Sequence, residues 1–146
     1  MTDPLDKLVI TSDCAGVDWH ELIDLIRRAP LGERDAALAQ RVFTGSYLCA
    51  FATIDGRLVG AARAISDGVT SSAIYDVVVD PDWQGRGVGK RVMLFMLEHL
   101  PKASVMLVSV VRYQTFYRRL GFKKLTTAYM IKESFESWVR DGYFEE

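Results

Sequence analysis

Apolar residues in the first third of the chain recur with the period of a helix. The pattern predicts a helix that Asp18 caps and that runs to about Arg28. Its apolar side is supplied by Leu22, Ile23, Leu25 and Ile26. A short strand at Lys7–Thr11 is predicted before this helix, and a second helix is predicted from about Glu33 to Phe43.

After this second helix the pattern changes to that of β-strands. Tyr47–Ile54 and Arg57–Ser66 flank Asp55-Gly56, and this dipeptide is the strongest short-range signal for a β-hairpin. Asp67-Gly68 marks the next turn, and Ser71–Val79 is predicted as the third strand. The middle of the chain is therefore predicted to form a three-stranded meander.

The second half of the chain returns to alternating helices and strands. A helix from Val88 to about Leu100 is predicted, with Val88, Val92, Phe95 and Met96 at core spacing. A strand at Val105–Val108, a short helix around Phe116–Leu120 and a strand at Phe122–Ile131 follow. This order predicts an α+β fold, a mixed and mostly antiparallel sheet with helices on both faces. We expect residues 1–146 to form a single domain.

Composition limits the classes of partner. The net charge of −1 argues against nucleic acid as the main partner, because no basic face is implied. No apolar run approaches the roughly 18 residues of a membrane-spanning helix. The N-terminal residues Met1–Pro4 lack the basic and apolar regions of a signal peptide, so we expect a cytoplasmic protein without membrane association.

The residues that most often bind metals or act as nucleophiles are scattered. Cys14 and Cys49 have neither metal-ligand spacing nor a CxxC pattern, which fits reduced, buried thiols. His20 and His99 lie on predicted helices, and no Ser–His–Asp assembly is available. We therefore expect no metal site.

A glycine-rich segment directly follows the third predicted strand and precedes an amphipathic helix. Backbone N–H groups at such a helix start bind anions, and the helix dipole adds roughly half a positive charge. Glycine lets a phosphate approach the backbone closely, so this segment predicts a phosphate site rather than a plain connecting turn. Its residues are Gln84, Gly85, Arg86, Gly87, Val88, Gly89 and Lys90.

The spacing excludes two common phosphate loops. A Walker A loop requires glycine at position 84 and Ser or Thr at position 91, which are Gln84 and Arg91 here. A dinucleotide fingerprint requires glycine or alanine where Lys90 stands. Gln84, Gly87 and Gly89 instead match Q-x-x-G-x-G, and here the chain resembles the GNAT superfamily of acetyl-CoA-dependent N-acetyltransferases.

A second segment supports this resemblance, which covers about residues 45–125. GNAT members commonly carry a tyrosine four residues before a Gly-Phe pair, as Tyr117 stands before Gly121-Phe122. The resemblance implies that the glycine-rich segment holds the CoA pyrophosphate. It also implies that Val77, Val78 and Val79 hold the pantetheine arm through their backbone, and that Tyr117 contacts the cofactor. In one departure, Val110 stands where members often carry an asparagine that touches the cofactor.

The chemistry of acetyl transfer assigns a role to Tyr117. The leaving thiolate resembles that of cysteine, with a pKa around 8.5, and a phenol with a pKa near 10 can share a proton with it. Tyr117 is the predicted general acid, and a half-buried packing aromatic is the alternative.

The general base that would accept the proton of the amine is less clearly defined by the sequence. The family's usual base positions fall at Ala73 and Tyr75, which offer no carboxylate. Strand alternation places Ala73, Tyr75 and Val77 on one face and Ile74, Asp76 and Val78 on the other. Asp76 is the only carboxylate in this strand, and a catalytic role, a structural role and a water chain past Tyr75 all remain open.

The acceptor is expected to be the primary amine of a small molecule. The residues around Asp67 and Asp76 look like the serotonin N-acetyltransferase-like branch of GNAT and also like many bacterial members. Either carboxylate suits a protonated amine, although Asp67 also fits a turn residue, and Tyr75 is expected to line the pocket. A protein lysine or N-terminal acetyltransferase and a non-catalytic acyl-CoA-binding module remain as alternatives. The C-terminal aromatic residues favour a homodimer.

Overall fold

The computed structural model describes residues 3–145. The chain divides into two compact units, Met1–Leu107 and Val108–Glu146. Of the helices within residues 3–145, none combines the length and apolar composition that crossing a bilayer requires.

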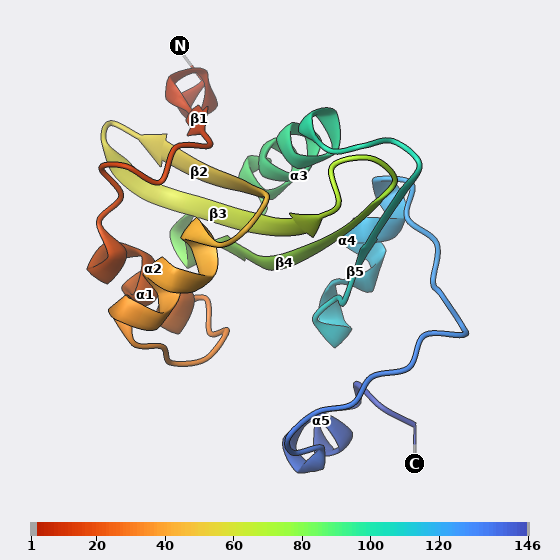
Figure 1. Ribbon diagram of the computed structural model, residues 1–146. Helices are drawn as coiled ribbons and strands as arrows, with labels where there is room; N and C mark the ends of the chain where they lie inside the picture. The colour runs from red at the N-terminus through yellow and green to blue at the C-terminus, as the bar shows by residue number, and fades with distance from the viewer. Residues whose placement is uncertain (1–2, 146) are drawn as a thin grey trace. The chain divides into compact units, whose positions relative to one another are not determined.

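The first unit is built on a five-stranded sheet (Figure 1). Its strands follow the spatial order β1 (Val9–Thr11), β2 (Leu48–Ile54), β3 (Arg57–Ser66), β4 (Ser71–Val79) and β5 (Ser104–Leu107). The first three pairings are antiparallel and β4 pairs with β5 in parallel, so the predicted mixed, mostly antiparallel sheet is confirmed. The β2–β3 turn has positive φ at both Asp55 (51°) and Gly56 (78°), as a type I′ hairpin requires.

Helices cover both faces of this sheet (Figure 1), as the sequence predicts. Helix α1 (Trp19–Arg28) and helix α2 (Ala36–Thr44) lie on one face, and helix α3 (Val88–His99) lies on the other. Asp18 caps α1 by accepting hydrogen bonds from the N–H groups of His20 and Glu21. Helix α2 begins three residues later than predicted, because Asp35 caps it through the N–H of Ala37.

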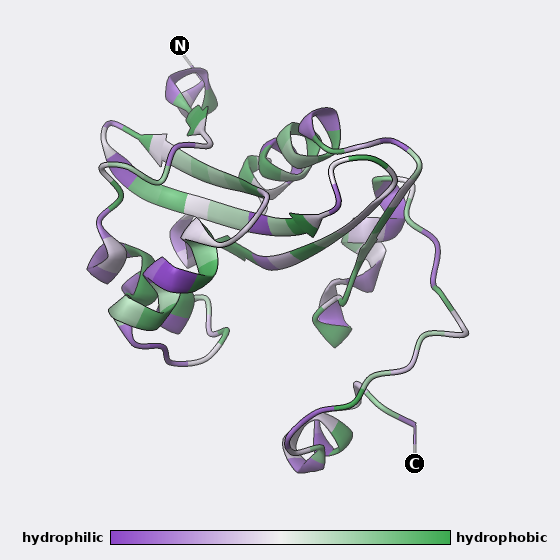
Figure 2. Cartoon of the chain, in the orientation of Figure 1, coloured by the Kyte–Doolittle hydropathy of each residue, from purple (hydrophilic) through white to green (hydrophobic). Residues whose placement is uncertain are grey.

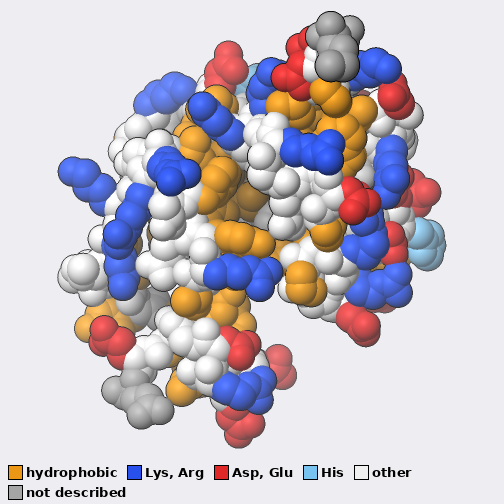
Figure 3. Space-filling model, turned by 180° about the vertical axis from the view of Figure 1, so that it is seen from behind, with side chains coloured by type: hydrophobic (Ala, Val, Ile, Leu, Met, Phe, Trp, Pro, Cys, Tyr) orange, Lys and Arg blue, Asp and Glu red, His pale blue; other side chains and the backbone are white. Residues whose placement is uncertain are grey.

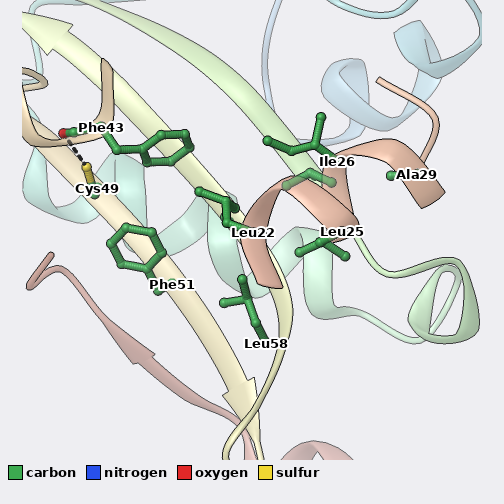
Figure 4. Close-up of a cluster of buried hydrophobic side chains, with 10 residues drawn as sticks. Leu22, Leu25, Ile26, Ala29, Phe43, Cys49, Phe51 and Leu58 are labelled. Atoms are coloured by element: carbon green, nitrogen blue, oxygen red, sulfur yellow. Dashed lines mark hydrogen bonds between the residues drawn. The ribbon is translucent and has the colours of Figure 1, made fainter. Parts of the chain in front are cut away.

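Most residues of the central strands β2 and β3 are buried, and hydrophobic colours run along both strands in Figure 2. On the α1 face, Leu22 lies beside the aromatic side chains of α2 and β2, and Ile26 belongs to the same buried cluster (Figure 4). The rings of Phe43 and Phe51 lie 5.8 Å apart, and the Sγ of Cys49 donates a hydrogen bond to the Phe43 carbonyl. This cluster fixes α1 and α2 against the sheet.

The opposite face of the sheet is lined by small residues. Gly60 lies under α3, and its strand partner Ala52 shares that face. A Cβ built on Gly60 would lie 3.1 Å from Val88 Cγ1 and 3.4 Å from Val92 Cγ2. The backbone of α3 can approach the sheet closely because these side chains are small or absent.

A β-bulge interrupts β4 and corrects the predicted alternation. Tyr75 pairs with Arg63 and Val78 pairs with Ala61, so two residues of β4, Asp76 and Val77, stand opposite one residue of β3. Tyr75 and Val78 therefore lie on the same face, whereas strict alternation had placed them on opposite faces. Asp76 has a φ of 56°, in the left-handed region that aspartate tolerates better than most residues.

The second unit contains a 3-10 turn, η3 (Val111–Tyr113), and two short helices, α4 (Gln114–Arg119) and α5 (Glu136–Arg140). The predicted strand at Phe122–Ile131 is wrong, because this segment is irregular. Tyr129 and Ile131 are 98% and 95% exposed, so their apolar side chains are not buried as the pattern predicted. A strand also needs a neighbouring backbone to pair with, and this segment pairs with none within residues 3–145.

Candidate functional site

The glycine-rich segment forms the start of α3. Gly87 is the N-cap residue and has a φ of 97°, and Gly85 has a φ of 75°. Both angles lie in the region that glycine adopts without strain. Within the described residues, the backbone N–H groups from Gln84 to Lys90 donate no hydrogen bond to a protein acceptor. These donors and the helix dipole are available to an anion.

A buried carboxylate anchors the entry to this segment. Asp80 is fully buried and caps the 3-10 turn η2 (Pro81–Trp83) through the N–H of Asp82. Its Oδ2 accepts a hydrogen bond of 3.0 Å from Arg28 of α1. Burial by itself would raise the pKa of Asp80, but the bonds from Arg28 and the Asp82 backbone, together with nearby arginine charges, lower it overall. The carboxylate therefore stays ionised and fixes the end of β4 to α1.

Contacts with neighbouring residues hold a cationic and a polar side chain of the segment in place. The guanidinium of Arg86 lies 5.1 Å from the ring centroid of Trp83, a cation–π contact. Gln84 donates a hydrogen bond of 3.1 Å to the Val79 carbonyl, which ties the segment to β4. Lys90 is exposed on the first turn of α3. The predicted phosphate site is thus a chain of free N–H donors with two basic side chains beside it.

One edge of β4 leads into this segment. Strand β5 pairs with β4 only from Ser71 to Ile74. From Tyr75 to Val79, the edge of β4 that faces away from β3 has no strand beside it within residues 3–145. The backbone of Val77, Val78 and Val79, predicted to hold the pantetheine arm, belongs to this open stretch.

Asp76 is held by two arginines. Its Oδ1 accepts a hydrogen bond of 2.5 Å from Arg34, and its Oδ2 accepts one of 2.6 Å from Nε of Arg63. Burial would raise the pKa of Asp76, but the bonds and charges of the two arginines lower it below the ordinary value. A carboxylate stabilised in its ionised form is a weaker proton acceptor, so this geometry favours the structural role that the sequence left open.

Neighbouring Tyr75 belongs to the same group of side chains. The guanidinium carbon of Arg63 lies 5.0 Å from the centroid of the Tyr75 ring. Tyr75 remains 38% exposed, so its ring can contact a bound molecule. Arg34 and Arg63 were missed by sequence reasoning. Arg34 is 42 residues from Asp76 in the chain, and no local pattern signals such a pairing.

Asp67 lies at the other end of β4 from the glycine-rich segment. Its Oδ1 accepts hydrogen bonds from the N–H groups of Val69, Thr70 and Ser71, and its Oδ2 accepts one from the Thr70 hydroxyl. These bonds, first that from the Val69 backbone, lower the pKa of Asp67 well below the usual range. Donors of the turn itself therefore occupy both carboxylate oxygens of Asp67. This arrangement is the one expected for a residue that stabilises a turn.

In the second unit, Tyr117 is the buried residue of α4. The helix ends in a Schellman motif, in which the N–H of Phe122 bonds to the Tyr117 carbonyl and the N–H of Gly121 bonds to the Arg118 carbonyl. The rings of Tyr117 and Phe122 lie 5.9 Å apart. The spacing of Tyr117 from the Gly-Phe pair therefore has a physical cause, because this motif requires glycine at C′, with a φ of 97°, and an apolar contact across the helix end.

Burial governs the acidity of Tyr117. Desolvation, with a smaller contribution from Tyr113, raises the pKa of its phenol to about 12. The phenol therefore remains protonated throughout the neutral range, as a proton donor must.

Comparison with known proteins agrees with these features. Residues 30–133 match the family model described as "Acetyltransferase (GNAT) domain". An uncharacterised N-acetyltransferase, ycf52, of Porphyra purpurea is 44% identical over 71 residues, which are 47% of this chain and 41% of that protein. Serotonin N-acetyltransferase 2, chloroplastic, of Oryza sativa subsp. japonica is 41% identical over 70 residues, covering 46% of this chain and 35% of that protein. The matched part of the chain spans less than half the length of these relatives.

Solved structures show the same fold over most of the chain. A Xanthomonas campestris protein assigned to the GNAT family superposes with a TM-score of 0.74 at 28% identity, covering 87% of this chain and 93% of that one. A GNAT-family acetyltransferase from Streptococcus pneumoniae, at 22% identity, superposes with a TM-score of 0.71 and covers 87% of this chain and 99% of that one. Since the family model covers most of the sequence and the fold agrees, the chain belongs to the GNAT acetyltransferase family.

Proposed function

We propose that the protein is an acetyl-CoA-dependent N-acetyltransferase that acts on the primary amine of a small molecule. The observation that carries this proposal is the run of free backbone N–H groups from Gln84 to Lys90, at the end of a strand with an open edge. The pyrophosphate of CoA would accept hydrogen bonds from these donors. Its pantetheine arm would extend back along Val79, Val78 and Val77, so that the thioester approaches the bulge of β4.

The proposed reaction is direct attack of the amine on the acetyl carbonyl. A C–N bond forms, the C–S bond breaks and the amine loses a proton. Asp76 is a poor base for that proton because two arginines stabilise its ionised form. We therefore assign the proton to a water held beside Tyr75, from which it passes to solvent.

Tyr117 is proposed as the general acid for the leaving thiolate. Complete proton transfer from a phenol of pKa about 12 to a thiolate of pKa about 8.5 would cost about 5 kcal/mol. A shared proton, with the phenol donating a strong hydrogen bond as the C–S bond breaks, avoids most of that cost. Tyr117 regains any donated proton from solvent.

Tyr117→Phe tests the acid directly. The variant keeps the ring that packs on Phe122, so acetyl-CoA affinity is expected to change little. The value of kcat should fall about 10²–10⁴-fold, with kcat/KM falling equally, because the lost interaction is made in the transition state. Near-normal turnover in a chemistry-limited assay would show that Tyr117 is a packing residue.

Gly87→Ala tests the cofactor loop. Since Gly87 has a φ of 97°, a side chain there strains the loop and turns its N–H groups, and we expect acetyl-CoA to bind about tenfold more weakly, the worth of one charge-assisted hydrogen bond. Gly16→Ala is the control for backbone strain, because Gly16 also has a positive φ (85°). A Cβ on Gly16 would meet open space, whereas one on Gly87 would lie 3.3 Å from Leu5 Cδ1, the end of a side chain. Unchanged affinity of the folded Gly87→Ala protein in calorimetry would contradict the loop assignment.

The names of two relatives bear on the acceptor class, and they point to different acceptors. The rice relative is named for serotonin, a small amine, whereas a Glycine max relative, 39% identical over 70 residues, is named histone acetyltransferase TAP1. A thiol-release assay with small amines and with lysine or N-terminal peptides separates these readings. Release with small amines alone supports the proposal. Tight CoA binding without turnover of any acceptor indicates an acyl-CoA-binding module.

We also propose a homodimer, with the C-terminal aromatic residues at its interface. Trp138 and Tyr143 stack with ring centroids 4.4 Å apart, and Phe135 and Phe144 lie 5.2 Å apart. Such a cluster offers a compact apolar surface for a second copy. Sedimentation at micromolar protein concentration that gives a monomer mass would exclude the dimer.

A further inference from the structure

The two arginines that hold Asp76 leave this part of the first unit with an excess positive charge. Two guanidiniums face one carboxylate, so the net charge of the group is +1. All three side chains are largely shielded from solvent, with exposures of 27% for Arg34, 15% for Arg63 and 11% for Asp76. Asp24 and Glu33 line the same pocket as Arg34, but neither forms an ion pair with it. A partly desolvated charge is unfavourable unless it is paired, so an anion that contacts both arginines is stabilised.

This group differs from the ion pairs on the surface of the unit. In Figure 3, acidic and basic side chains are interspersed around the histidine at the right of the view. On α1, Arg27 pairs with Asp24, and the Arg27 side chain is 62% exposed. Solvent screens such pairs, whereas the excess charge beside Asp76 is only partly screened.

The arginines retain hydrogen-bond donors for a ligand. A guanidinium has five N–H donors. Arg34 uses Nη2 on Asp76, while Arg63 uses Nε on Asp76 and Nη1 on the hydroxyl of Ser46 at 3.4 Å. The remaining N–H groups are free to bind an oxyanion, and the planar fork of arginine suits carboxylate and phosphate alike.

The group lies where the acceptor of the proposed reaction would approach. Asp76 is the bulge residue at the open edge of β4, directly before the valines proposed to hold the pantetheine arm. Arg63 extends from β3 over the half-exposed ring of Tyr75. Arg34 comes from the connection between α1 and α2, so it reaches the bulge from a second direction.

We propose that Arg34 and Arg63 bind an oxyanion, a carboxylate or a phosphate, that the acceptor amine carries, and this inference rests on the proposed acetyltransferase function. Asp76 is then a positioning residue that holds the two guanidiniums side by side. An acceptor without an anionic group would bring only its ammonium to a group of net positive charge. The acceptor class is thereby narrowed from small amines to small amines that carry an oxyanion.

The first test compares acceptors of similar size with the wild-type protein. CoA release is measured with β-alanine, phosphoethanolamine and propylamine, and with tyrosine against tyramine. We expect kcat/KM to be about tenfold or more higher for the anionic member of a series, since a hydrogen bond to a charged group contributes about 1.5–3 kcal/mol. Preference for β-alanine indicates a carboxylate site and preference for phosphoethanolamine a phosphate site. Equal or better use of propylamine and tyramine overturns the inference.

The second test uses Arg34→Gln with Arg41→Gln as its control. Arg34→Gln should raise KM for the preferred anionic acceptor about tenfold or more, whereas propylamine should show no such loss, because it has no oxyanion for Arg34 to bind. Arg41→Gln should change neither, because it removes a charge from an exposed side chain of α2 that forms no ion pair within residues 3–145. An equal loss with acceptors that carry an oxyanion and with those that lack one would assign Arg34 a purely structural role and refute the proposal.

Calorimetry with acetyl-CoA separates this inference from the function on which it rests. A protein that binds acetyl-CoA and acetylates propylamine or tyramine best retains the proposed function, and only the oxyanion site is refuted. A protein that binds no acetyl-CoA, or releases no CoA with any of these acceptors, refutes both.

Discussion

Gly60 of β3 sets how closely α3 approaches the sheet, and Gly60→Ala is expected to destabilise the protein. An added Cβ would lie 3.1 Å from Val88 Cγ1, 3.3 Å from the Val78 carbonyl oxygen and 3.4 Å from Val92 Cγ2. Both valines are fully buried and the oxygen belongs to the backbone, so none of these neighbours can move away freely. The helix must shift outward or the strand must bend.

The size of the effect follows from two opposing contributions. Replacing glycine by alanine within a strand gains about 0.5–1 kcal/mol, because the unfolded chain loses conformational freedom. Overpacking a filled core by one methyl group costs about 1–3 kcal/mol. The clash is the larger contribution, and a change of 1 kcal/mol moves the melting temperature by about 2–4 °C for a protein of this size. We therefore expect the melting temperature of the Gly60→Ala protein to fall by several degrees.

The same substitution should weaken acetyl-CoA binding, because Val88 is the first residue of α3 and directly follows Gly87 of the proposed cofactor loop. Thermal unfolding by circular dichroism and calorimetric titration with acetyl-CoA measure the two effects. Ile26→Val is the control, since it removes one methyl group from the opposite face of the sheet at a similar cost of about 0.5–1.5 kcal/mol. Ile26→Val should lower the melting temperature and leave the affinity for acetyl-CoA unchanged. An unchanged or higher melting temperature for Gly60→Ala would refute the packing argument.

Two further predictions concern single side chains. Asp67→Ala should lower the melting temperature at pH 7, because four donors of the β3–β4 turn lose their acceptor. Since folding lowers the pKa of Asp67, its contribution is fully present above the unfolded value of about 3.9 and is lost as pH falls towards the lower folded value. The difference from wild type should therefore shrink in melts below pH 4, and a constant difference would contradict this role. Burial raises the pKa of the Cys49 thiol to about 12, so Cys14, whose Sγ lies 3.9 Å from that of Cys49, should react first with a disulfide reagent in the folded protein. Cys14→Ser should remove the fast phase of labelling, and a fast phase that survives would show Cys49 to be accessible.

Local interactions let the sequence alone determine much of this protein. Asp18 caps α1 through N–H groups two and three residues ahead, and Asp55-Gly56 forms its turn from its own backbone preferences. The glycine-rich segment and the helix end at Tyr117 are equally local. Gly85, Gly87 and Gly121 adopt positive φ, and the hydrogen bonds that close the helix end at Tyr117 span only a few residues. Because these features depend on neighbours in sequence, the family resemblance could be read from them.

Only the tertiary structure decided the features that depend on distant partners. The bulge at Asp76 depends on how β4 aligns with β3, and one extra residue there moves Val78 to the face opposite the one that alternation predicts. Phe122–Ile131 has the composition of a strand but no partner backbone in the described chain, so its pattern alone could not make it one. The pairing of Asp76 with Arg34 bridges 42 residues and converts an expected ammonium-binding carboxylate into part of a positively charged group. Sequence spacing determines structure within a turn or a helix, whereas charge and burial at this site depend on which distant side chains the fold brings together.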